Sequence, residues 1–94
     1  MLRRVLELRI MRIKTAISIS DHAFGTGDYV EAATYAAFAR DCAEPIYADC
    51  YGLAQSLDDE GYGACAAWYE YAEEVGQLID TACAMLHDCE RYVI

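Results

Sequence analysis

Residues 45–57, Pro-Ile-Tyr-Ala-Asp-Cys-Tyr-Gly-Leu-Ala-Gln-Ser-Leu, carry the clearest helical pattern in this chain. Their apolar side chains recur every three or four residues and therefore share one helix face: Ile46, Tyr47, Cys50, Leu53, Ala54 and Leu57. We expect this helix to begin at Pro45, because the first helical turn tolerates a residue without a backbone N–H. The run Asp58-Asp59-Glu60-Gly61 is expected to end it, since acids suit the start of the following helix better.

The stretch that precedes this helix is also predicted to be helical. Residues 29–43 are dense in alanine, the strongest helix former. Asp28 stands just before them, where an aspartate side chain can accept the free N–H groups of the first turn. Gly25 and Gly27 favour a turn over residues 22–28. We interpret this stretch as a tight turn and not a phosphate loop, because the lysine and the spacing of a phosphate loop are missing.

The two ends of the chain complete the helical pattern. An apolar stripe in the N-terminal segment predicts a first helix, although the alternation over residues 12–19 also permits a strand. Residues 62–92 follow a near-heptad apolar rhythm without a strong breaker. They form either one long helix or two helices bent near Gly76, because a glycine costs only about 1 kcal/mol in a helix interior. The stripe of the first helix consists of Leu2, Leu6, Ile10, Ile13 and Ile17.

These patterns predict an all-α fold. The 94 residues suffice for one domain, 1–94, in which four or five helices form a small antiparallel bundle. Much of the apolar content is alanine, which buries little area, so we expect the eight tyrosines and Trp68 to supply much of the burial.

A weak internal repeat suggests a family resemblance. The pattern Gly27-Asp28-Tyr29-x-Glu31-Ala32-x-x-Tyr35-x-x-x-Ala39 resembles the turn and second helix of a tetratricopeptide repeat. Its Tyr29, Ala32, Tyr35 and Ala39 recur 33 residues later as Tyr62, Cys65, Trp68 and Ala72, and the resemblance covers about residues 16–76. It implies two stacked helix hairpins followed by a C-terminal helix. It also implies a concave face that binds a peptide.

Charge divides the chain into two parts. Residues 1–14 form a basic amphipathic segment with five bases and one acid, a net charge of +4. Residues 15–94 form an acidic body with fifteen acids and two bases, a net charge of −13. Such a body repels nucleic acids and anionic membranes and attracts basic surfaces. The basic helix either lies across the acidic body or projects toward an anionic partner, and its apolar stripe favours the first alternative.

The acids are interspersed with tyrosines, which are good interface residues. We therefore expect a non-catalytic protein that inhibits or regulates a larger partner by docking on its basic surface, including a surface that normally holds nucleic acid. Small size, strong acidity and the lack of catalytic residues are similar to phage inhibitors such as anti-CRISPR proteins. The alternatives are a tetratricopeptide-like adaptor that binds a peptide and a Cys/His metal-binding bundle. The predicted partner-binding residues are Asp49, Tyr51, Asp58, Asp59, Glu60, Tyr62, Tyr69, Glu70, Glu73 and Glu74.

The metal alternative depends on Cys83, His87 and Cys89. Cys83 and His87 are one helical turn apart and could both reach a soft ion, but zinc would need further ligands from other helices. No arrangement of nucleophile, base and orienting group has a recognisable spacing, so we expect no enzyme activity and no cofactor.

The cysteines indicate the compartment. Their number, five, is odd, and no secretory signal or transmembrane run accompanies them, so we expect free thiols in the cytoplasm. Met1 and Met11 are alternative starts of the native chain. The excess of apolar residues on a small body also favours a homo-oligomer or a partner-covered face.

Overall fold

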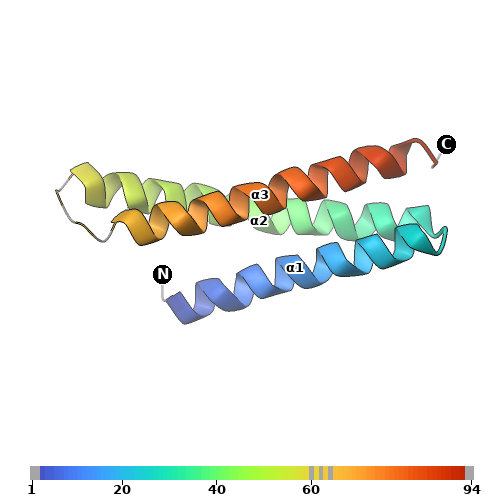
Figure 1. The fold of residues 1–94 in the computed structure, drawn as a ribbon, viewed down its shortest axis with the longest axis horizontal. Helices are drawn as coiled ribbons and strands as arrows, with labels where there is room; N and C mark the ends of the chain where they lie inside the picture. The colour runs from blue at the N-terminus through green and yellow to red at the C-terminus, as the bar shows by residue number, and fades with distance from the viewer. Residues whose placement is uncertain (1–2, 60, 62, 64, 93–94) are drawn as a thin grey trace.

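The computed structural model describes residues 3–59, 61, 63 and 65–92. Three helices make up this part of the chain: α1 (Arg3–Gly25), α2 (Tyr29–Asp59) and α3 (Cys65–Glu90) (Figure 1). The described residues contain no strand, which confirms the all-α prediction and the helical alternative for residues 12–19. The prediction of four or five helices is not confirmed, because the described residues form three.

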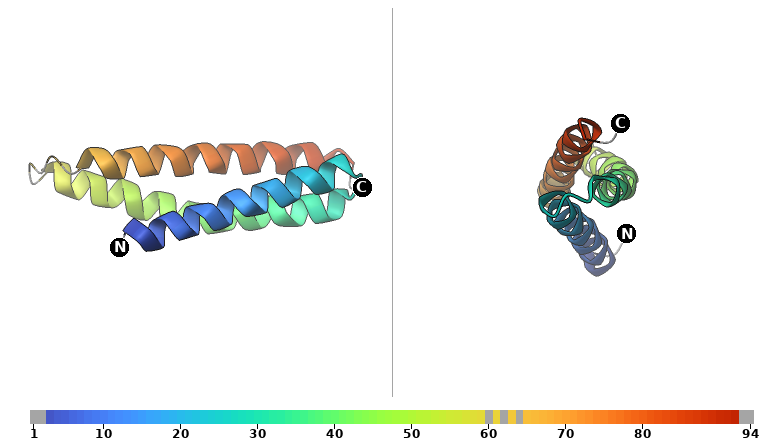
Figure 2. Two further views of the ribbon diagram at one scale, coloured as in Figure 1. Left: turned by 60° about the horizontal axis from the view of Figure 1, so that its bottom comes forward. Right: turned by 90° about the vertical axis from the view of Figure 1, so that its right-hand side faces the viewer.

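The lower number of helices comes mainly from α2. Pro45 lies inside this helix and does not begin a new one, so the predicted boundary there is wrong. An interior proline removes one hydrogen bond and costs about 3 kcal/mol. Its neighbours offset that cost, because Ala43 and Ile46 are buried on the inner side while Pro45 itself is exposed. In Figure 2, α2 curves along its length and remains a single helix.

The alternatives for the C-terminal segment are resolved in favour of one helix. α3 continues from Cys65 to Glu90 through Gly76 without a bend that breaks it. Gly76 faces Tyr47 of α2, and a Cβ atom at position 76 would lie 3.2 Å from Cε2 of that ring. A larger residue at position 76 would therefore meet the neighbouring helix α2.

The turn between α1 and α2 is shorter than the predicted break. Residues 22–25 belong to α1, and Gly27 has a positive φ of 85°, which a glycine adopts at little cost. Asp28 caps α2 as predicted: its Oδ1 accepts a hydrogen bond from the backbone N–H of Glu31 at 3.1 Å.

The helices form an open, elongated arrangement. Consecutive helices run antiparallel, and α2 packs on both neighbours, while α1 and α3 touch each other much less (Figures 1 and 2). The radius of gyration is 15.2 Å, against about 12 Å for a compact domain of this length. The hairpin end of α2 and α3 extends beyond the N-terminus of α1, so α1 covers only part of the other two helices (Figure 1).

The core is narrow and rich in alanine. Leu6, Ile13 and Val75 are among its largest fully buried side chains, and nine alanines and two cysteines share the interior. Every described tyrosine is half-buried or exposed, and Trp68 is half-buried. The expectation that the aromatic residues supply much of the burial therefore holds only for their partly covered rings. The buried alanines of α2 and α3 are Ala32, Ala36, Ala39, Ala43, Ala54, Ala72 and Ala82.

The basic first helix lies on the acidic body, as favoured from the sequence. Its stripe packs inward, with Leu6, Ile10 and Ile13 buried. Lys14 forms an ion pair with Glu74 of α3 at 2.7 Å. The buried hydroxyl of Ser20 donates a hydrogen bond of 2.7 Å to a backbone carbonyl of α2, which fixes the position of α1 along it.

Two further predictions concern family and membranes. The tetratricopeptide resemblance stays a prediction, because antiparallel helices are common to that family and to other bundles. No helix in the described part of the chain has the length and apolar character needed to cross a membrane.

Candidate protein-docking surface

Three tyrosine rings from α2 and α3 lie in contact on one side of the hairpin. Tyr47 and Tyr51 are one helical turn apart on α2, and their rings stack with centroids 6.0 Å apart. Tyr51 meets Tyr69 of α3 edge to face at 5.8 Å. Tyr47 and Tyr51 remain 38% and 41% exposed, so their rings present apolar area to solvent.

Carboxylates surround these rings. Glu73 and Asp80 of α3 line a hollow together with Tyr47. Asp58 lies beside the start of α3, where its Oδ1 accepts a weak hydrogen bond from Sγ of Cys65 at 3.8 Å. We define the tyrosine face as Tyr47, Tyr51, Asp58, Tyr69, Glu73 and Asp80.

The tyrosine face points away from α1. Two polar contacts join α3 to α1: the Tyr71 hydroxyl donates to Oε1 of Glu7 at 3.0 Å, and Glu74 pairs with Lys14. Tyr69 and Tyr71 are two residues apart, which is about 200° around a helix, so they leave α3 on nearly opposite sides. α1 therefore leaves the tyrosine face uncovered.

The electrostatics of the face are one-sided. Among the described residues only two ion pairs form, Lys14–Glu74 and Arg40–Asp41, and neither involves an acid of the tyrosine face. Partial burial raises the pKa of the Tyr69 hydroxyl, and the negative charge of Asp58 raises it further. Asp58, Glu73 and Asp80 thus carry negative charge without an ion pair to any base in the described part of the chain.

The structure separates other predicted partner-binding residues from this group. Glu74 is on the α1 side and is paired with Lys14. Glu70 follows Tyr69 by one residue, about 100° around α3, and lies on the outer surface of that helix. Asp59 is exposed at the end of α2, where its charge also raises the pKa of Tyr69.

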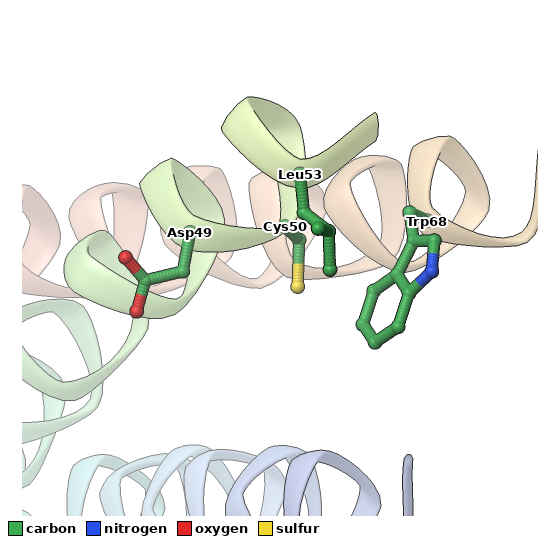
Figure 3. A pocket seen from close by; sticks show the side chains of 4 residues that line it. All are labelled: Asp49, Cys50, Leu53 and Trp68. Carbon is green, nitrogen blue, oxygen red and sulfur yellow. The ribbon is translucent and has the colours of Figure 1, made fainter. Parts of the chain in front are cut away.

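Asp49 lies on the opposite side of α2, toward α1. With Cys50, Leu53 and Trp68 it lines a hollow of about 270 Å³ (Figure 3). In Figure 3 the Cys50, Leu53 and Trp68 side chains point into the space on the α1 side of the hairpin, and the Asp49 carboxylate lies at its edge. Asp49 therefore belongs to the groove between α1 and α2 and not to the tyrosine face.

Two further predicted residues, Glu60 and Tyr62, lie outside the described part of the chain. Sequence reasoning missed Tyr47 and Asp80 as members of the face. Spacing could have found them, because Tyr47 precedes Tyr51 by four residues and Asp80 follows Glu73 by seven. Tyr47 was instead assigned to the apolar helix face, whose rim it occupies.

The three residues of the metal alternative are not brought together. Cys83 and His87 are exposed, whereas Cys89 is buried near Ala23 and Ala32. Within residues 3–59, 61, 63 and 65–92, no three His, Cys, Asp or Glu side chains are close enough to hold one metal ion.

Comparison of the chain with protein-family models, with curated proteins and with solved structures finds no match.

Proposed function

We propose that this chain is a non-catalytic interaction protein that docks through the tyrosine face onto a basic surface of a larger partner and thereby inhibits or regulates it. The observation that carries the proposal is the side-by-side arrangement of half-exposed tyrosine rings and exposed carboxylates without a paired base. Tyrosines supply contact area at a small entropic cost, and carboxylates steer the face toward positive charge.

A basic surface that binds nucleic acid is the partner chemistry that suits this face best, since carboxylates compete with phosphates for the same arginines and lysines. All five cysteines are free thiols, which supports a place in the reducing cytoplasm.

The test compares two variants with the same loss of charge. Asp58→Asn/Glu73→Gln/Asp80→Asn neutralises three acids of the tyrosine face, and Glu31→Gln/Glu70→Gln/Asp88→Asn neutralises three exposed acids outside it. Tagged proteins are used to capture partners at low and high salt, and the captured proteins are identified. We expect the wild type and the second variant to capture the same basic proteins. The first variant should not capture them, and high salt should release them from the other two.

Equal capture by both variants would show that net charge alone attracts the partner, and the docking proposal would then fail. Circular dichroism of both variants controls for folding, because all six substitutions are at exposed positions.

A further inference from the structure

A hollow lies in the tyrosine face between α2 and α3. Its volume is about 460 Å³, whereas one water molecule occupies about 30 Å³ of the liquid. The hollow can therefore hold the head group of a side chain and not just an ion. Its lining consists of Tyr47, Glu73, Gly76, Gln77, Ile79 and Asp80.

Gly76 keeps the hollow open. A Cβ atom at this position would lie 3.2 Å from Cε2 and 3.5 Å from Cδ2 of Tyr47, so the ring lies directly over the α3 backbone. The absence of a side chain at position 76 also leaves space between Glu73 and Asp80, which precede and follow it on the same side of α3. The hollow thus has an aromatic wall, a backbone floor and a carboxylate toward each end.

Among the described residues, no base forms an ion pair with the carboxylates of this hollow. Neither Glu73 nor Asp80 takes part in an ion pair within the described residues. Arg40 precedes Tyr47 by seven residues, about two helical turns, and its guanidinium pairs with Asp41 at 3.0 Å. The charge of the hollow is therefore complementary to a cation supplied from outside.

We infer that the hollow is an anchor site for an arginine side chain of the partner, an assignment that rests on the proposed docking function. A guanidinium is planar and weakly hydrated, so it can stack on the Tyr47 ring while it donates hydrogen bonds to Glu73 or Asp80. A lysine ammonium is compact and strongly hydrated, and it gains less from the aromatic wall. The site therefore selects arginine over lysine at equal charge.

The first experiment uses tetra-arginine and tetra-lysine peptides as probes of the intact protein. Two-dimensional ¹⁵N–¹H NMR resolves the backbone amide of Gly76 from the other glycines, of which the chain has only six in total. We expect tetra-arginine to shift the Gly76 amide and to leave that of Gly52 in place, because Gly52 lies in α2 with open space around it. We also expect tetra-arginine to bind several-fold more tightly than tetra-lysine.

The second experiment assigns the preference to residues. Glu73→Gln/Asp80→Asn should weaken tetra-arginine binding about tenfold more than the charge-matched control Glu70→Gln/Asp88→Asn. Tyr47→Leu keeps an apolar side chain but removes the ring, so it should equalise the affinities for the two peptides. All these residues are at exposed positions, and thermal unfolding checks that each variant is folded.

The results separate the anchor from the docking function. Equal affinities for both peptides in the wild type, with an unmoved Gly76 amide, would overturn the arginine site. The docking proposal would still stand if partner capture remained sensitive to the acids of the tyrosine face. If partner capture were also insensitive to those acids, both the arginine site and the docking proposal would fail.

Discussion

Replacing Gly52 and Gly76 by alanine, one at a time, tests the contact that shapes the tyrosine face. Both glycines lie inside long helices, where alanine is more stable by about 1 kcal/mol. A Cβ atom at Gly52 meets nothing within 4 Å. We therefore expect Gly52→Ala to raise the free energy of unfolding by nearly the whole of that amount.

At Gly76 the same gain meets an opposing cost. The new Cβ would lie 3.2 Å from the Tyr47 ring, so the ring must rotate from its rotamer or lose its stacking on Tyr51. Either change costs about 0.5–1.5 kcal/mol. The two effects nearly cancel, and we expect Gly76→Ala to lie within about 0.5 kcal/mol of the wild type, clearly below Gly52→Ala.

Urea unfolding followed by circular dichroism measures both values, and a difference of 1 kcal/mol corresponds to about 4–8 °C in Tm for a domain of this size. In a Tyr47→Ala background, Gly76→Ala should regain about 1 kcal/mol, because the opposing ring is gone. Equal gains at the two glycines in the wild-type background would refute the reasoning. They would mean that Tyr47 does not lie over the α3 backbone.

Three other predictions concern the core, the thiols and the stability at alkaline pH. Leu6→Ala should lower the free energy of unfolding in urea by about 2–5 kcal/mol, because Leu6 is fully buried on the inner side of α1. A loss below about 1 kcal/mol would contradict the packing of that helix against α2 and α3. Maleimide should label the exposed Cys83 well before Cys50, whose thiol pKa is raised by burial, and peptide mass spectrometry over time would show equal rates if this is wrong. The hydrogen bond to Glu7 raises the pKa of Tyr71 above its usual 10.0, so the stability it contributes is present below that pH and is lost as pH rises through the raised pKa. Between about pH 9 and about pH 11, the midpoint of urea unfolding should therefore fall less in Tyr71→Phe than in the wild type. Parallel declines would argue against the hydrogen bond between Tyr71 and Glu7.

Local signals predicted those features of the fold that depend on nearby residues alone. Asp28 caps α2 because its carboxylate reaches a backbone N–H three residues away, a contact that requires no knowledge of the rest of the chain. The apolar stripe of the first helix is buried for the same reason, since its spacing already defines one face.

Pro45 shows where local signals fail. A proline is a strong helix breaker in isolation, and its position favoured a boundary. The buried residues on both sides of it, Ala43 and Ile46, pack against neighbouring helices and outweigh that preference. Such packing depends on residues far away in the sequence, so the number of helices could not be derived from propensity.

The membership of the tyrosine face was predictable only in part. The sequence indicates that some tyrosines must lie among acids at the surface, and Tyr51, Asp58, Tyr69 and Glu73 do so. It does not indicate which side of α3 faces α1. That assignment separates Glu74, which pairs with Lys14, from Glu73, which remains free for a partner within the described structure.

The alanine core and the exposed tyrosine rings have one physical cause. Along α2 the fully buried positions are mostly alanines spaced by three and four residues, so α2 and α3 approach closely and leave no interior space for a ring. Tyr47, Tyr51 and Tyr69 therefore lie outside the core, where their rings contact one another and Tyr47 and Tyr51 present apolar area to solvent. The tyrosine face is thus a consequence of how the helices pack, and a change that separated α2 from α3 would remove it even if all its residues remained.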